Sequence, residues 1–116
     1  MKELGDCFDK HGRMFLFEGQ GEDCKIVHGI VINTHDKMPM THCWLEKTEE
    51  VEFPGGNTHP MTSCIDKSNG NDQELPAELY YRVGNVQDTK KYDLEQYRAL
   101  VLEHGTWGPW ELICDR

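Results

Sequence analysis

Residues 25–46 read KIVHGIVINTHDKMPMTHCWLE, and this stretch decides the fold. Residues 26–32 are rich in Ile and Val on both faces, which predicts a strand in the interior of a sheet. Residues 33–39 have turn chemistry, with Asn33, Asp36 and Pro39 among them. Residues 41–46 predict a second strand, so the two strands should form an antiparallel hairpin.

A helix is expected before this hairpin, over residues 7–17. Phe8, Met14 and Phe15 mark its apolar side, and Asp6 stands at the position of an N-cap. Gly12 weakens the helix by about 1 kcal/mol relative to Ala. Residues 19–21, Gly-Gln-Gly, should end it as a C-cap and loop.

The remaining chain predicts short strands and late helices. Strands are expected around residues 51–53 and over 62–66, and residues 54–57 should interrupt the strand pattern between them. A turn is expected over residues 67–72. A short helix over 76–83 opens with proline, and the clearest helix covers 93–104 and ends at Gly105. The tail at 107–110 is aromatic and should cover the sheet. Together these features predict one α+β domain over residues 1–116, with the N-terminal helix packed on a small antiparallel sheet.

Composition limits the partners and the compartment. The formal net charge is −9, from 21 acidic and 12 basic residues, and such a surface should repel nucleic acid. The first residues lack the apolar run of a secretory signal, and no stretch is long and apolar enough for a membrane span. Five cysteines without such a signal predict reduced thiols. We therefore expect a cytoplasmic protein, or one in the host cytoplasm if a phage encodes it, with no membrane partner.

Three residues form a candidate catalytic constellation. Cys7 follows the expected cap at the start of the helix, where unpaired N–H groups favour a thiolate and can stabilise an oxyanion. His42 lies on a predicted strand, which would hold an imidazole firmly as a general base. Asp66 ends the next strand and could orient that ring. Neighbouring antiparallel strands bring such side chains within reach of one another.

The order of these elements resembles the transglutaminase-like branch of the papain-like cysteine hydrolases. More closely, short stretches resemble a group of small uncharacterised phage and bacterial proteins of that type. Lys67 stands where that group has proline, Thr41 and Cys43 stand where it has Gly and Ala, and residues 54–61 look like an inserted loop. The matching stretches are Gly5-Asp6-Cys7-Phe8, Val27-His28-Gly29-Ile30-Val31, Thr41-His42-Cys43-Trp44-Leu45-Glu46, Ile65-Asp66-Lys67-Ser68-Asn69-Gly70, Leu79-Tyr80-Tyr81 and Gly105-Thr106-Trp107-Gly108-Pro109-Trp110.

The resemblance implies acyl transfer through a Cys7–His42–Asp66 triad and a thioester intermediate. Hydrolysis of an amide or isopeptide bond in a protein or peptide is the plainer outcome, and transfer to an amine uses the same machinery. No cofactor and no metal are expected. His28 and Gln20 are candidates for the second oxyanion donor.

Other interpretations stay open beside this one. The chain could be an inactive relative of the fold that binds a protein partner through its acidic surface, as a phage accessory module. Cys7-x3-His11 and Cys24-x3-His28 have workable zinc-ligand spacing, although no Cys-x2-Cys pair occurs. Residues 49–52, Glu-Glu-Val-Glu, are expected to be a solvated strand edge. Cys24, Cys43, Cys64 and Cys114 are expected in the core, and His11, His35, His59 and His104 in solvent.

Overall fold

The computed structural model describes residues 6–19, 23–67 and 72–112. Its strands form one antiparallel sheet in the order β4-β3-β2-β1-β5. The strands are β1 (Cys24–Ile32), β2 (Pro39–Glu52), β3 (Thr58–Asp66), β4 (Gln73–Pro76) and β5 (Asp88–Tyr92), and the helices are α1 (Asp6–Phe17), α2 (Ala77–Gly84) and α3 (Leu94–His104). This arrangement confirms the α+β class, the N-terminal helix, the antiparallel sheet and the late helices.

The predicted hairpin is present as β1 and β2. Its pairs run from Cys24 opposite Lys47 to Ile32 opposite Pro39, and the intervening turn is closed by hydrogen bonds between Asn33 and Met38. β1 also pairs with β5 on its other side. The strand therefore lies in the interior of the sheet, as its Ile- and Val-rich sequence indicates.

The sequence prediction was wrong about the segments that follow the hairpin. Residues 41–46 and 51–53 belong to one continuous strand, β2, and residues 58–61 begin β3 instead of forming an inserted loop. Only residues 53–57 form the tight turn, with two positive-φ glycines, Gly55 and Gly56. β4 and β5 were not predicted. Pairing with β3 extends β2, so the chain keeps its strand conformation through a polar sequence.

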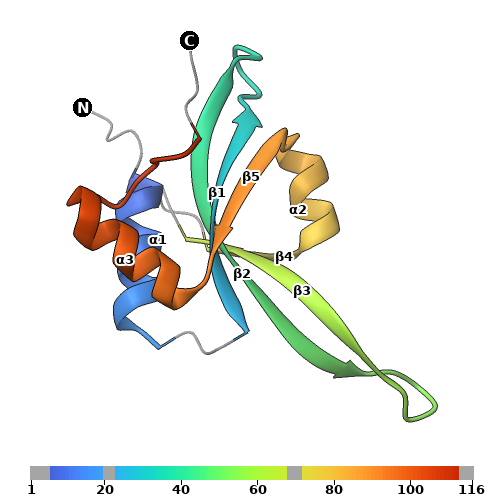
Figure 1. Ribbon diagram of the computed structural model, residues 1–116. Coiled ribbons are helices and arrows are strands. Elements are labelled where there is room, and N and C mark those ends of the chain that lie inside the picture. Colours follow the sequence, from blue (N-terminus) through green and yellow to red (C-terminus); the bar gives the residue numbers. More distant parts are fainter. Residues whose placement is uncertain (1–5, 20–22, 68–71, 113–116) are drawn as a thin grey trace.

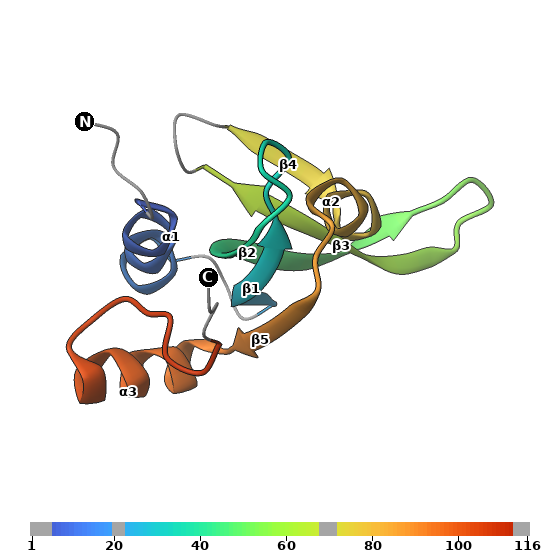
Figure 2. The same ribbon diagram turned by 90° about the horizontal axis from the view of Figure 1, so that it is seen from above.

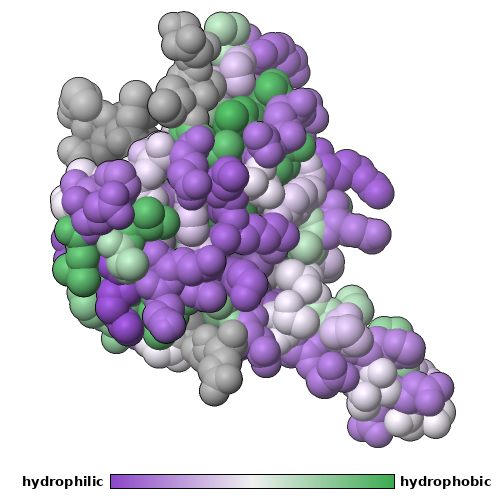
Figure 3. Space-filling view, in the orientation of Figure 1, coloured by the Kyte–Doolittle hydropathy of each residue, from purple (hydrophilic) through white to green (hydrophobic). Residues whose placement is uncertain are grey.

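The outer parts of β2 and β3 form a ribbon that projects from the rest of the molecule (Figures 1 and 3). β1 pairs with β2 only as far as Lys47, so residues 49–52 have β3 on one side and no strand on the other among the described residues. These four residues are exposed. The expected solvated edge is therefore present, and it belongs to a two-stranded ribbon.

Helices cover both faces of the sheet. α1 and α3 lie on one face and α2 on the other (Figure 2). Alternation along β2 divides its side chains accordingly: Cys43 and Leu45 join the core under α1 and α3, whereas Trp44 packs with Tyr80 of α2. Cys24 and Cys64 are also buried, as expected, and Cys114 lies outside the described residues.

Local signals explain the ends of the helices. Asp93 caps α3 by accepting from the backbone N–H of Gln96, whose side chain bonds back to Asp93, and Gly105 ends the helix in the left-handed region. Gly19, also with positive φ, follows α1. The side chain of Asp6, the expected cap of α1, lies outside the described part of the structure.

The aromatic tail packs on the α1 and α3 side, as expected. Trp107 and Trp110 are half-buried against that core. A Cβ at Gly12 would lie 2.4 Å from the Trp107 ring and 2.5 Å from the Tyr97 hydroxyl oxygen. Glycine in α1 therefore permits a close approach that its low helix propensity does not reveal.

Candidate active site

His42 and Asp66 meet where β3 ends beside β2. The last β2–β3 pair joins Leu45 to Ile65, so Asp66 ends its strand next to the part of β2 that carries His42. The Nε2 atom of His42 lies 2.9 Å from Oδ2 of Asp66. The two side chains are 15% and 6% exposed, so the pair is shielded from most of the solvent.

Cys7 joins this pair from the second position of α1. Burial lowers the pKa of His42, but hydrogen bonds with the Asp66 and Cys7 side chains, and the charges of both, raise it to about 9. The structure therefore brings together the three residues that the sequence nominated, from a helix and two strands.

Cys7 is only 2% exposed. It lies within the core cluster beneath α1, beside Cys43. Burial raises the pKa of Cys43 well above its ordinary range, and raises that of Cys24 to about 11. Among the described residues neither of these two thiols is hydrogen-bonded to a histidine, so Cys7 differs from them in its imidazole neighbour.

Tyr80 of α2 is a member of the site that sequence reasoning did not assign. Its hydroxyl donates to Oδ2 of Asp66 over 2.7 Å. Burial, together with the Asp66 carboxylate, raises the pKa of Tyr80, so the hydroxyl keeps its proton and remains a donor. The same carboxylate oxygen thus receives bonds from His42 and Tyr80. The signal in the sequence was the amphipathic pattern of α2, which directs Tyr80 inward.

His11 was predicted to be solvated, and that prediction was wrong: it is fully buried. Its Nδ1 lies 2.9 Å from the carbonyl oxygen of Cys7, and its Nε2 accepts the backbone N–H of Lys67 over 3.0 Å. A carbonyl can only accept, so Nδ1 carries the proton and the ring is neutral in this arrangement. His11 therefore ties the start of α1 to the residue after Asp66, whose Oδ1 is 4.0 Å from Nε2. The i, i+4 spacing from Cys7 was the available signal.

His28 lies apart in a cage of aromatic rings. Its ring centroid is 4.9–6.0 Å from those of Phe8, Tyr92, Tyr97 and Trp110. Both ring nitrogens are buried and have no hydrogen-bond partner in the described part of the chain. Burial lowers the pKa of His28 to about 4, while Glu111 opposes this. This is the environment of a neutral core residue. Gln20, the other candidate oxyanion donor, lies outside the described residues.

The two zinc-like spacings do not extend to larger ligand sets. Within residues 6–19, 23–67 and 72–112, no group of three or more His, Cys, Asp or Glu side chains could hold a metal ion. No helix in the same residues is long and apolar enough to cross a membrane. His35, His59 and His104 are exposed, as expected.

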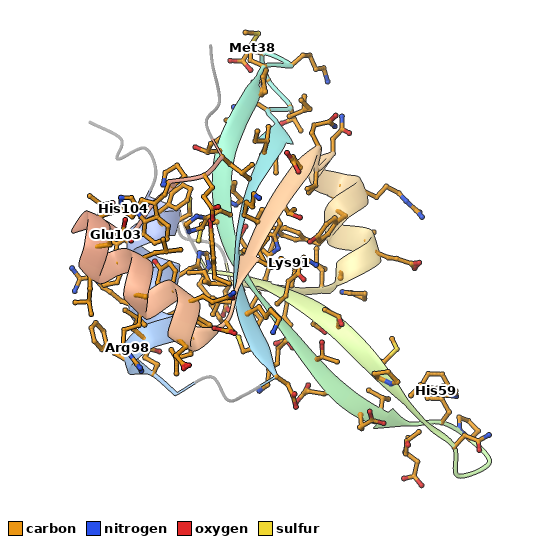
Figure 4. All side chains as sticks on the ribbon, in the orientation of Figure 1. Met38, His59, Lys91, Arg98, Glu103 and His104 are labelled. Carbon is orange, nitrogen blue, oxygen red and sulfur yellow. The ribbon has the colours of Figure 1, made fainter. Side chains whose placement is uncertain are left out.

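A second polar cluster surrounds Glu46 on the α2 side of the sheet. Its Oε2 accepts from Trp44 Nε1 over 3.1 Å, from Cys64 Sγ over 3.7 Å and from the Tyr81 hydroxyl. Its Oε1 is 3.0 Å from Nζ of Lys91, which lies on the edge strand β5 (Figure 4). The Glu46 carboxylate is thus fully engaged by neighbours from three strands and α2, which indicates a structural role.

Two cavities lie on the same face as α2. One of about 620 Å³ is lined by Glu46, Tyr81 and Lys91, among others. The other, of about 350 Å³, is lined by His42, Asp66 and Tyr80 together with aliphatic side chains. The smaller cavity therefore borders two members of the candidate triad, His42 and Asp66.

The comparisons with known proteins give no relative. No protein-family model, no curated protein and no solved structure matches this chain.

Proposed function

We propose that this protein is a cysteine hydrolase or acyltransferase acting on an amide or isopeptide bond, on a transglutaminase-like variant of the papain-like fold. The observation that carries the proposal is the His42 imidazole, bonded at Nε2 to Asp66 and contacted by Cys7. A nucleophile, a base and a group that orients the base are the components of nucleophilic acyl transfer. The order of these residues along the chain resembles that of the transglutaminase-like proteins, which further supports the proposal.

The raised pKa of His42 supports a protonated ring at neutral pH. The proposed nucleophile is the thiolate form of Cys7, because the thiolate and not the thiol attacks a carbonyl. In the first step the Cys7 sulfur attacks the amide carbon and a C–S bond forms. His42 then gives its proton to the leaving nitrogen, and the C–N bond breaks to leave a thioester.

In the second step a water molecule or an amine attacks the thioester carbon. His42 accepts the proton of the attacking group, the C–S bond breaks, and the thiolate is released. Asp66 accepts from Nε2 throughout and stabilises the charged ring, while Tyr80 holds the carboxylate in place. Backbone N–H groups at the start of α1 supply an oxyanion donor.

A non-catalytic relative that binds a protein through its acidic surface is the second candidate. Two observations favour it: Cys7 is 2% exposed, and the formal net charge is −9. In such a protein the Cys7–His42 contact would be a packing feature, and the thiol would need no special reactivity.

Alkylation by iodoacetamide separates the two candidates. The rate at each cysteine is measured by peptide mapping between pH 5 and 9, in a Cys114→Ser background, so that only cysteines described in the structure are compared. We expect Cys7 to react fastest at pH 7, because burial raises the pKa of Cys24, Cys43 and Cys64.

The variants His42→Ala and Asp66→Asn should remove that advantage, and His59→Ala provides the matched control. His59 is exposed on β3 at the outer end of the ribbon (Figure 4). Circular dichroism checks that each variant is folded. If Cys7 reacts no faster than Cys24, or reacts equally in His42→Ala, the catalytic proposal fails and the binding module takes its place.

A further inference from the structure

The cavity beside His42 has a composition that selects among substrates. It encloses about 350 Å³ between the sheet and α2, and its aliphatic walls come from Val31, Ile32, Met40, Leu75 and Val83. This volume lies within the range of pockets that hold small ligands or side chains. The triad end of the cavity carries His42, Asp66 and Tyr80.

No lysine, arginine or glutamate is among the described residues that line this cavity. Its two titratable triad members already bind each other, and Asp66 also accepts from Tyr80. A charged group entering the cavity would lose its hydration without gaining a counter-ion, which is unfavourable. An aliphatic group would instead gain from the removal of its surface from water.

We propose that this cavity is a substrate subsite of the triad and that it takes an uncharged aliphatic chain of the substrate. The inference rests on the proposed function, because it assigns a chain attached to the amide group that Cys7 attacks. The imidazole forms part of the cavity wall and also contacts Cys7. Cys7 is not among the described residues that line the cavity, so a seated chain would place its amide beside the His42 ring, which contacts Cys7.

Haloacetamides with different tails test the subsite. The Cys7 sulfur displaces iodide from each reagent and forms a C–S bond. Because the reaction is the same for every reagent, differences in rate report the effect of the tail. The reagents are iodoacetamide, N-butyl iodoacetamide and an N-(3-carboxypropyl) iodoacetamide of similar length. We expect the butyl reagent to react roughly tenfold faster than iodoacetamide, which is the effect of burying about two methylene groups. The carboxylate reagent should show no advantage.

Val83→Glu and Leu79→Glu form a matched pair of variants. Both residues lie on α2 and both are exposed, at 63% and 42%, but only Val83 lines the cavity. The butyl-to-iodoacetamide rate ratio within each variant should fall toward one in Val83→Glu and should stay near its original value in Leu79→Glu.

Binding in a Cys7→Ser protein gives a readout that does not depend on reactivity. N-butylacetamide should shift the NMR resonances of the His42 ring, and Val83→Glu should weaken this binding. Fast alkylation of Cys7 by iodoacetamide with no butyl advantage and no binding overturns the subsite and leaves the triad. An inert Cys7 overturns the proposed function and, with it, the assignment as a substrate subsite. Binding of N-butylacetamide would then show an apolar site without catalysis.

Discussion

Replacing His28 by phenylalanine should remove a pH-dependent loss of stability on the acid side. Burial lowers the pKa of His28 from an ordinary 6.5 to about 4. Between these values the unfolded chain binds a proton at this residue and the folded protein does not. Stability therefore falls as the pH falls below 6.5, and the loss is complete below about pH 4. A difference of about 2.5 pH units corresponds to roughly 3 kcal/mol.

The measurement is the free energy of unfolding by urea, followed by tryptophan fluorescence, at several pH values between 4 and 7. His28→Phe keeps an aromatic ring in the cage. The extra ring atom must fit against Gly108, where a Cβ would already lie 2.4 Å from the His28 ring. That packing effect shifts the whole curve by a constant amount. The titration of His28 is reported by how the difference in unfolding free energy between the two proteins changes with pH. The titration of carboxylates, which both proteins share, cancels in this difference.

We expect the native protein to lose about 3 kcal/mol more than His28→Phe between pH 7 and pH 4. His35→Phe, which replaces an exposed histidine, is the matched control and should follow the native curve. Parallel curves for the native protein and His28→Phe would refute the reasoning, because they would mean that His28 is protonated equally easily in both states.

Three further predictions concern the site and its supports. His42 has a pKa raised from 6.5 to about 9. Its contribution to the free energy of unfolding is therefore fully present below pH 6.5 and is lost as the pH rises through 9. Urea unfolding should show a loss of roughly 3 kcal/mol over this range in the native protein; an equal loss in His42→Gln would contradict this origin. Tyr80→Phe removes a buried donor to Asp66 and should cost about 1–3 kcal/mol in unfolding free energy, and an unchanged urea midpoint would argue against the bond. Gly12→Ala adds a Cβ 2.4 Å from the Trp107 ring and should destabilise by about 1–3 kcal/mol despite its better helix propensity; a rise in melting temperature would show that the tail does not pack there.

Much of the fold was predictable because its signals are local. The β1–β2 hairpin follows from Ile- and Val-rich runs around a turn, and α3 follows from Asp93 and Gly105 at its ends. β5 could not be predicted, since its sequence DTKKY buries only Tyr92 and owes its strand conformation to pairing with β1. Such pairing between distant segments leaves no periodicity in a single strand's sequence.

The candidate site was predictable only in part. Cys7, His42 and Asp66 could be nominated from element order and residue chemistry, and the structure brings them together. His11 and Tyr80 were not nominated, because the spacing from Cys7 and the amphipathic pattern of α2 do not indicate their bonds to Lys67 and Asp66. A histidine among polar helical residues is ordinarily solvated, so its burial depends on a contact that only the folded chain provides.

The single long strand β2 should contain two regions with different local stability. Residues 39–47 pair with β1, residues 45–47 pair with β3 as well, and helices cover both faces of this part of the sheet. Beyond Thr48, whose N–H donates to the Asp23 carbonyl, the described residues give β2 only β3 as a neighbour, and a two-stranded ribbon is marginal in water by itself. Opening of the outer ribbon, around residues 49–61, should therefore require far less free energy than global unfolding. The ribbon can fray and re-form while the half of β2 that carries His42 stays closed.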